Sequence, residues 1–359
     1  MNKSGALDVI REDIRALQAY PVPVADGLVK LDMMENPHVL PAPLAHALGE
    51  HLGRVALNRY PPGEPAAFKR KLAARVGMPP SSALLLGNGS DELIHLVILA
   101  CARPGAAVLA PWPSFAMYRM SSLLDRCRFV DVSLRPDFAL DVDATLAAIE
   151  RESPAVIFLS YPNNPTGNLF DRGAIEAILD RAPGLVVIDE AYLPFAQQTW
   201  MDELPRRGSL LVLRTLSKLG LAGLRLGYLC GAPDWLAQFD KVRPPFNVNV
   251  LTLAAVEFLL DHFDVLDAQA AEVRAERARL QSRLAALPDV EVFESAANFL
   301  LFRVHAARET FAALLRQGIL IKDVSTAHPL LRECLRVTVG TAHENDRFLQ
   351  VLRTILERN

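Results

Sequence analysis

The chain has 359 residues, 51% of them hydrophobic, and a formal net charge of −3. This length accommodates two domains, or one large domain with a satellite, and the near-neutral charge excludes the basic footprint of a nucleic-acid-binding protein. No run of 18 uncharged apolar residues occurs, the four cysteines form no C-x-x-C pair, and the histidines lack metal-binding spacing, so we expect a cytoplasmic protein without a membrane span or a metal site.

Between about residue 80 and residue 245, short apolar runs alternate with amphipathic stretches. Strands are predicted at 106–112, 128–134, 155–161, 185–192, 210–215 and 225–231. Several of these runs are apolar on both faces, which is typical of buried parallel strands. Apolar residues at helical spacing predict helices at 91–103, 142–152 and 173–182. The alternation indicates an α/β sheet with helices on both sides.

From Val250 onward the pattern is that of a smaller α+β unit. Residues 265–287 predict a long helix whose apolar face carries Val273, Leu280, Leu284 and Leu287. A strand pair, a helix, the strand 335–340 and a last helix follow. We therefore predict a large domain over 31–249, and a small domain built from both chain ends, 1–30 and 250–359, with an N-terminal arm.

Ligands of open α/β sheets bind outside the carboxyl ends of the strands, so the residues that follow each strand are candidates for the site. In "GNGSDEL" (87–93), Gly87 and Gly89 allow a tight turn, and Ser90 and Asp91 begin a helix whose free N–H groups can bind an anion. An ordinary glycine turn with a serine cap is the alternative. In "YPNNPTG" (161–167), Asn164 can project an amide into the cleft, although the segment also reads as a simple turn.

Two further strand ends carry ionisable groups. Asp189, in "DEAY", ends a buried strand, where a carboxylate is costly unless a cation meets it, and Tyr192 follows. A structural ion pair with an arginine is the alternative for Asp189. Lys218, in "TLSK", follows the next strand, and Ser217 and Arg225 flank it. An amine in a dry, partly cationic pocket has a lowered pKa, and its neutral form attacks aldehydes.

The combination of these groups indicates a cofactor. Pyridoxal phosphate needs an amine for its aldehyde and a carboxylate that keeps its ring nitrogen protonated. It also needs polar partners for its ring hydroxyl, and a helix N-terminus with cationic or hydroxyl donors for its phosphate. Each of these needs has a candidate in the sequence.

Seven motifs carry a resemblance to a known family over nearly the whole chain. They are, in order, "NRYPPGE", "GNGSDEL", "YPNNPTG", "DEAY", "TLSK", "LAGLRLGY" and "LRVTVGT". With them the sequence resembles the fold-type I pyridoxal-phosphate-dependent aminotransferases, and within these the histidinol-phosphate aminotransferases. The resemblance implies a large domain with a mostly parallel sheet flanked by helices, plus a smaller α+β domain.

The resemblance also implies roles for the cofactor residues. Lys218 would bond to the cofactor aldehyde and later move the substrate proton. Asp189 would pair with the ring nitrogen, and Tyr192 and Asn164 would bond the ring oxygen. The residues implied to hold the phosphate are Gly89, Ser90, Asp91, Ser217 and Arg225. Phe115, in "PWPSFAMY", would stack on the ring.

Further implied residues concern the partner subunit and the substrate. Tyr60 would cross to the neighbouring subunit's cofactor, which makes the active unit a homodimer. Arg336 would grip the α-carboxylate of glutamate bidentately, or the phosphate of histidinol phosphate, with Lys322 and Tyr20 as helpers and Asn164 nearby. A surface ion pair is the alternative for Arg336. Departures from the family pattern include Met34, where many relatives carry asparagine, and Lys322, where some carry arginine.

The implied reaction is transamination between L-histidinol phosphate or imidazole-acetol phosphate and 2-oxoglutarate or L-glutamate, in histidine biosynthesis. Two other enzymes fit the same cofactor residues: an aminotransferase for aromatic or other amino acids, and a decarboxylase of an O-phosphorylated amino acid. A cofactor-binding arm of a transcription regulator would need a DNA-binding domain, and only about 30 residues precede the family-like region, too few for one.

Overall fold

The computed structural model describes residue 5 and residues 9–19 and 24–357 of the chain. Tyr20, a candidate substrate residue, lies outside the described residues. Within the described part of the chain, no helix is long and apolar enough to cross a membrane.

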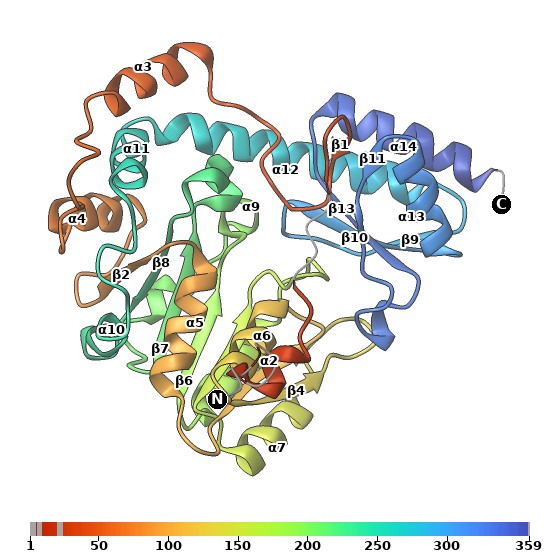
Figure 1. Ribbon diagram of the computed structural model, residues 1–359. Helices are drawn as coiled ribbons and strands as arrows, with labels where there is room; N and C mark the ends of the chain where they lie inside the picture. The colour runs from red at the N-terminus through yellow and green to blue at the C-terminus, as the bar shows by residue number, and fades with distance from the viewer. Residues whose placement is uncertain (1–4, 6–8, 20–23, 358–359) are drawn as a thin grey trace.

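A seven-stranded sheet forms the centre of the larger part of the molecule (Figure 1). In sheet order its strands are β2 (Ala83–Gly87), β8 (Gly227–Gly231), β7 (Leu210–Thr215), β6 (Leu185–Asp189), β5 (Val156–Ser160), β3 (Ala107–Trp112) and β4 (Arg128–Ser133). All neighbouring strands pair in parallel except β8, which is antiparallel to both β2 and β7. The predicted, mostly parallel α/β sheet is therefore confirmed.

Successive residues of the buried strands enter separate cores on the two faces of the sheet. In β6, Leu185 and Val187 belong to one core, and Val186 and Ile188 belong to the other. The helices on the first face are α5 (Ser90–Cys101), α6 (Ala116–Leu124) and α10 (Pro233–Asp240), and those on the second are α7 (Val142–Glu152) and α8 (Arg172–Arg181). Because helices cover both faces of the sheet, neither face of its buried strands meets water. This explains why these strands are continuous apolar runs.

A second sheet, of four antiparallel strands, lies beside the first (Figure 1). Its strands are, in sheet order, β12 (Lys322–Asp323), β13 (Cys334–Thr338), β10 (Phe299–Val304) and β9 (Val290–Val292), and the helices with it are α12 (Phe263–Ala285), α13 (Ala307–Arg316) and α14 (Ala342–Leu356). The strand β1 (Val29–Lys30) pairs in parallel with β11 (Ile319–Leu320), so the two ends of the chain meet here.

Three more helices lie near β2 and β8, and a short one lies near α6 (Figure 1). The first three are α3 (Ala42–Leu52), α4 (Ala66–Arg75) and α11 (Val250–Leu260), and α11 packs against both α3 and α4. The short helix α2 (Glu12–Arg15) is held near α6, because Arg11 donates to the Leu124 carbonyl oxygen at 3.1 Å. The domain limits 31–249 and 1–30 with 250–359 remain a prediction.

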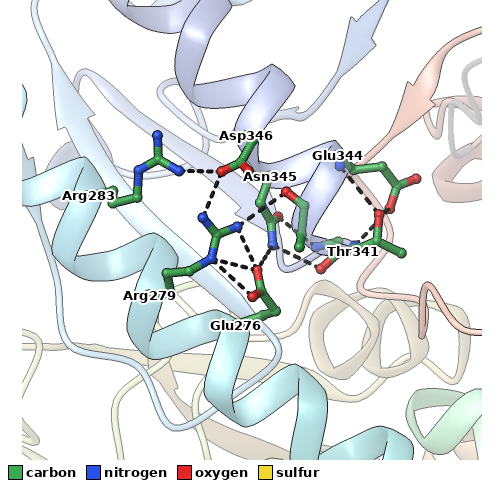
Figure 2. Close-up of polar contacts among 9 residues, drawn as sticks. Glu276, Arg279, Arg283, Thr341, Glu344, Asn345 and Asp346 are labelled. Carbon is green, nitrogen blue, oxygen red and sulfur yellow. Dashed lines mark hydrogen bonds and ion pairs between the residues drawn. The ribbon is translucent and has the colours of Figure 1, made fainter.

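A cluster of hydrogen bonds and ion pairs connects the start of α14 to α12 (Figure 2). Thr341 caps the helix reciprocally with Glu344, which is a capping box. Asn345 donates to Glu276 of α12 at 3.0 Å, and Arg279 donates to Glu276 at 2.8 Å and to Asp346 at 2.7 Å. The cluster fixes the last helix of the chain against the long helix that joins the two sheets.

Inside the large sheet, Glu190 and Arg214 form a buried ion pair at the ends of β6 and β7. The Arg214 Nε donates to the Glu190 carboxylate at 2.9 Å, and the side chains are 5% and 0% exposed. Thr199 and the Trp200 amide also donate to Glu190, at 2.9 and 2.6 Å. Arg214 therefore compensates the negative charge of the Glu190 carboxylate, and the other donors satisfy the lone pairs of its oxygens.

Replacing Arg214 by methionine should lower the free energy of unfolding by about 3–5 kcal/mol, because it leaves Glu190 buried and unpaired. Urea denaturation followed by fluorescence measures this change. Arg207→Met is the control, since it removes a partly exposed pair with Asp180 and should change stability by less than about 1 kcal/mol. Similar losses in the two variants would contradict the importance given to the buried pair.

Candidate active site

Strand direction brings five predicted segments to one edge of the large sheet. The parallel strands β2, β5, β6 and β7 end at this edge, and the antiparallel β8 begins there. The register pairs Asp189 with Ser160 on one side and with Leu213 on the other, and it pairs Gly227 with Gly87 and with Thr215. The segments that carry Asn164, Asp189, Lys218, Arg225 and the 87–91 turn consequently meet.

Asp189 is 3% exposed at the end of β6. Its carboxylate accepts hydrogen bonds from the Tyr118 hydroxyl at 2.7 Å and from the Ala191 amide at 3.0 Å. No ion pair to Asp189 is present among the described residues, so the arginine-pair alternative is wrong for Asp189 and applies to its neighbour Glu190. Burial raises the pKa of Asp189 to about 6. The site therefore holds a carboxylate that a cationic ligand would stabilise.

Tyr118 is a site residue that sequence reasoning did not identify. It is fully buried on α6, and its ring stacks on Phe158 with centroids 4.7 Å apart. Its only signal in the sequence is an aromatic residue at the end of "PWPSFAMY", a segment in which no helix is predicted, and a buried aromatic residue is equally typical of a core position. Phe115, a predicted cofactor residue, lies at the N-terminus of the same helix, and its ring meets that of Tyr118 edge-on at 5.6 Å.

The side-chain amide of Asn164 forms hydrogen bonds with both Tyr192 and Arg336. The Asn164 side chain donates to the Tyr192 hydroxyl at 3.0 Å and accepts from Arg336 at 2.5 Å. Arg336 also donates to the Asp32 carbonyl oxygen at 2.9 Å. Arg336 is 6% exposed, so the surface-ion-pair alternative is wrong. Through these bonds the second sheet contributes a cation to the edge of the first.

Lys322 lies on β12 directly opposite Arg336 of β13 in the register of the second sheet. Residues directly opposite each other on paired strands project to the same face, so the two cationic side chains belong to one face of this small sheet. Lys322 is partly buried. The predicted grouping of Arg336 with Lys322 is consistent with this register.

Lys218 lies in an irregular turn (η2, Ser217–Leu221) after β7, and it is partly buried. Its Nζ donates to the Met33 carbonyl oxygen at 3.0 Å and lies 6.0 Å from the centre of the Tyr192 ring. Burial, and then the positive charge of Arg336, lower the pKa of Lys218 to about 8. A larger fraction of this amine is neutral at physiological pH than for an ordinary lysine, which agrees with the sequence-based expectation of a nucleophile.

The 87–91 turn and the start of β8 are packed so closely that only glycines fit. A Cβ on Gly227 would lie 2.6 Å from the Ser90 nitrogen, and a Cβ on Gly89 would lie 2.6 Å from the Arg225 guanidinium. Gly89 also has a φ of +88° and precedes the first residue of α5, Ser90, with no side-chain cap at that position. The serine-cap alternative is therefore wrong, because Ser90 is already inside the helix.

Ser217 and Asp91 meet the Arg225 guanidinium beside this turn. Arg225 donates to the Ser217 hydroxyl and to the Asp91 carboxylate, each at 3.3 Å. Its backbone is left-handed, with a φ of +51°, and β8 starts only at Gly227 rather than at residue 225 as predicted. A helix N-terminus, a hydroxyl and a guanidinium gathered here can bind a phosphate.

Tyr60 lies apart from this cluster. It is 81% exposed, and its ring stacks on that of Phe246 with centroids 4.9 Å apart. Within the described residues it makes no polar contact with Lys218, Asp189 or Arg225 of the same chain.

Comparison with known proteins identifies the family of the chain. The family model described as aminotransferase class I and II matches residues 28–352. The chain is 57% identical to histidinol-phosphate aminotransferase 1 of Burkholderia lata over 350 residues, which are 97% of this chain and 98% of that protein. It is 53% identical to the histidinol-phosphate aminotransferase of Chromobacterium violaceum over 345 residues, or 96% and 97% of the two chains.

A solved structure confirms the architecture. The crystal structure of histidinol-phosphate aminotransferase from Sinorhizobium meliloti in complex with pyridoxal-5'-phosphate matches with a TM-score of 0.87 over 98% of this chain and 99% of that one, at 23% identity. At that identity the likeness shows a shared fold, which confirms the predicted fold-type I architecture. On the family model and the close relatives, the chain belongs to the class I and II aminotransferases, and within them to the histidinol-phosphate aminotransferases.

Proposed function

We propose that this protein uses pyridoxal 5'-phosphate to move an amino group between L-glutamate and imidazole-acetol phosphate, giving 2-oxoglutarate and L-histidinol phosphate in histidine biosynthesis. The observation that carries the proposal is the position of two groups at adjacent strand ends. The amine of Lys218, whose pKa is lowered to about 8, follows β7, and the buried carboxylate of Asp189, which has no cationic partner among the described residues, ends β6. The relatives that share more than half of its residues carry the name of this activity.

The residues at the sheet edge fit the cofactor. The uncompensated carboxylate of Asp189 suits a protonated ring nitrogen, and the hydroxyl and amide of Tyr192 and Asn164 suit the ring oxygen. The residues that would hold the phosphate are Ser90, Ser217, Arg225 and the backbone from Gly89 to Asp91. Phe115 would lie against the ring, beside Tyr118.

When bound, pyridoxal phosphate supplies an aldehyde that accepts the amino group and a ring that withdraws electrons from the neighbouring carbon. The lowered pKa of Lys218 lets its amine accept the proton of the substrate α-carbon and return it, as a general base near neutral pH must. Asp189 keeps a proton on the ring nitrogen, and Tyr118 and Ala191 hold the carboxylate in place.

The two cationic residues of the second sheet, Arg336 and Lys322, form a cationic corner that would select the substrate. Arg336 presents a planar fork that suits the carboxylate of glutamate or the phosphate of histidinol phosphate, and Lys322 adds a second charge on the neighbouring strand. Both substrates carry an anionic group, so one corner can serve the two half-reactions.

The active unit would be a cytoplasmic homodimer. Tyr60 is exposed on its own subunit and stacks on the exposed Phe246, and aromatic residues of this kind are enriched at the interfaces of protein complexes. In the dimer its hydroxyl would reach the cofactor phosphate of the neighbouring subunit.

A substrate panel on the purified protein tests the reaction. With 2-oxoglutarate as acceptor, kcat/KM for L-histidinol phosphate should exceed that for L-phenylalanine by at least about a hundredfold, since a phosphate presents more charge and more free oxygens to Arg336 and Lys322 than the single carboxylate of phenylalanine does. Lys218→Ala should lose turnover with both substrates. A preference for phenylalanine would favour the aromatic aminotransferase, and release of carbon dioxide without a keto acid would favour the decarboxylase.

Asp189→Asn should still bind the cofactor but transaminate at least about a hundredfold more slowly, because a neutral amide stabilises the charged ring poorly.

The same substitution should change how the stability of the cofactor-free protein depends on pH. The pKa of Asp189 rises from 3.8 to about 6 in the fold, so its contribution to the free energy of unfolding falls as pH rises from about 4 to about 6. The variant should lack this contribution in urea titrations. An unchanged rate, or an unchanged pH dependence of stability, would contradict the assignment.

Subunit mixing tests the crossing of Tyr60. Tyr60→Ala and Lys218→Ala should each be impaired alone. Co-expressed, they form heterodimers in about half of the dimers, each with one intact site, so about one quarter of the wild-type activity should return. No recovery would mean that Tyr60 does not serve the neighbouring site.

A further inference from the structure

Glu92 holds the turn that precedes α5 from an unusual position. It is the third helical residue, and its carboxylate accepts a hydrogen bond from the Asn88 amide at 2.6 Å. In a capping box, a glutamate at this position bonds the amide of the N-cap residue, which here is Gly89. Glu92 instead bonds the residue before it, and the Gly89 amide donates to the Gly87 carbonyl oxygen at 2.9 Å.

A second donor fixes the same carboxylate from a distant segment. The Asn247 side chain donates to the Glu92 carboxylate at 2.5 Å. Asn247 is held in turn by Arg243, which donates to its amide oxygen at 2.8 Å and to Asp240 at 2.7 Å. Glu92 is therefore clamped between the turn that it supports and residues 243–247.

The segment 243–247 also faces the surface that carries Tyr60. Phe246, next to Asn247, is 42% exposed and forms the stack with Tyr60. A cavity between residues 61–65 and residues 243–248 reaches Leu86, at the end of β2. The turn at 87–89 and the exposed aromatic pair are thus linked through one asparagine and one glutamate.

The turn needs such support because its own sequence is permissive. Gly87 and Gly89 have no side chains that restrict their dihedral angles, and a flexible turn must lose conformational entropy when an anion binds to its N–H groups. A hydrogen bond that fixes the turn beforehand lowers that loss, and binding becomes tighter.

We infer that Glu92 is a positioning residue for the cofactor phosphate: its carboxylate fixes the Asn88 amide and so the backbone of the 87–90 turn, and Asn247 orients that carboxylate. The inference rests on the proposed function, since it places the phosphate at this turn. Glu92 itself acts through the turn and through Asn88. Its effect is therefore confined to ligands that carry the phosphate.

Pyridoxal, which lacks only the phosphate, separates this role from a general structural one. Full-length wild-type protein and its variants are dialysed to equilibrium with pyridoxal phosphate or with pyridoxal, and the dissociation constants are measured by absorbance. Glu92→Ala should weaken binding of pyridoxal phosphate about 10- to 100-fold, as loss of a charged hydrogen bond does, and leave that of pyridoxal unchanged. Glu92→Gln keeps an acceptor for Asn88 and should restore most of the affinity.

Two further variants complete the set. Asn247→Ala should also weaken binding of pyridoxal phosphate, by a smaller factor than Glu92→Ala does. Glu309→Ala is the matched control, because Glu309 is exposed at the same third position of α13 and its loss should change neither constant.

Equal losses for both ligands in Glu92→Ala, or no loss for either, would overturn the inference while leaving the proposed function intact. If the wild-type protein bound pyridoxal phosphate no more tightly than pyridoxal, the phosphate site of the proposed function would itself be wrong.

Discussion

A buried carboxylate that has no cationic partner among the residues the structure describes is the constraint on which the rest of the site depends. Asp189 is enclosed at the end of β6, and its partners there, the Tyr118 hydroxyl and the Ala191 amide, are neutral. Its neighbour Glu190 has Arg214 as a counter-ion. The two acids of one motif thus have different surroundings: Glu190 is paired with a buried arginine, whereas Asp189 would be stabilised by a cationic ligand, as the proposed function requires for a protonated ring nitrogen.

Strand direction explains how groups distant in sequence reach this carboxylate. The antiparallel β8 starts at the end of the sheet where β7 ends, so the turn between them brings Lys218 and Arg225 to the same end as Asp189 and the 87–91 turn. The second sheet contributes Arg336, which is joined to Tyr192 through Asn164. The guanidinium of Arg336 consequently influences the amine of Lys218, because its charge helps to lower the pKa of Lys218.

Much of this arrangement could be predicted from the sequence, and the remainder depends on contacts between distant residues. Strong periodicity located the long helix predicted at 265–287, which spans Phe263–Ala285 in the structure. The order of the motifs along the sequence identified the candidate cofactor residues. The sequence could not reveal that Arg214 pairs with Glu190 rather than Asp189, or that Tyr118 is the hydroxyl donor, because several strands and a helix must pack before those side chains meet. The close approach of Gly227 to Ser90 is likewise a tertiary contact that no local pattern encodes.

The most direct measurement of the central claim is chemical trapping of the Lys218 amine, which lies at the same end of the sheet as this carboxylate. The cofactor-loaded protein is reduced with borohydride, which makes a lysine–cofactor bond permanent, and is then digested and analysed by mass spectrometry. The reduced cofactor should be found on the peptide that contains Lys218, at close to one equivalent per chain. Its attachment to a different lysine, or its absence from every peptide, would contradict the proposed role of Lys218.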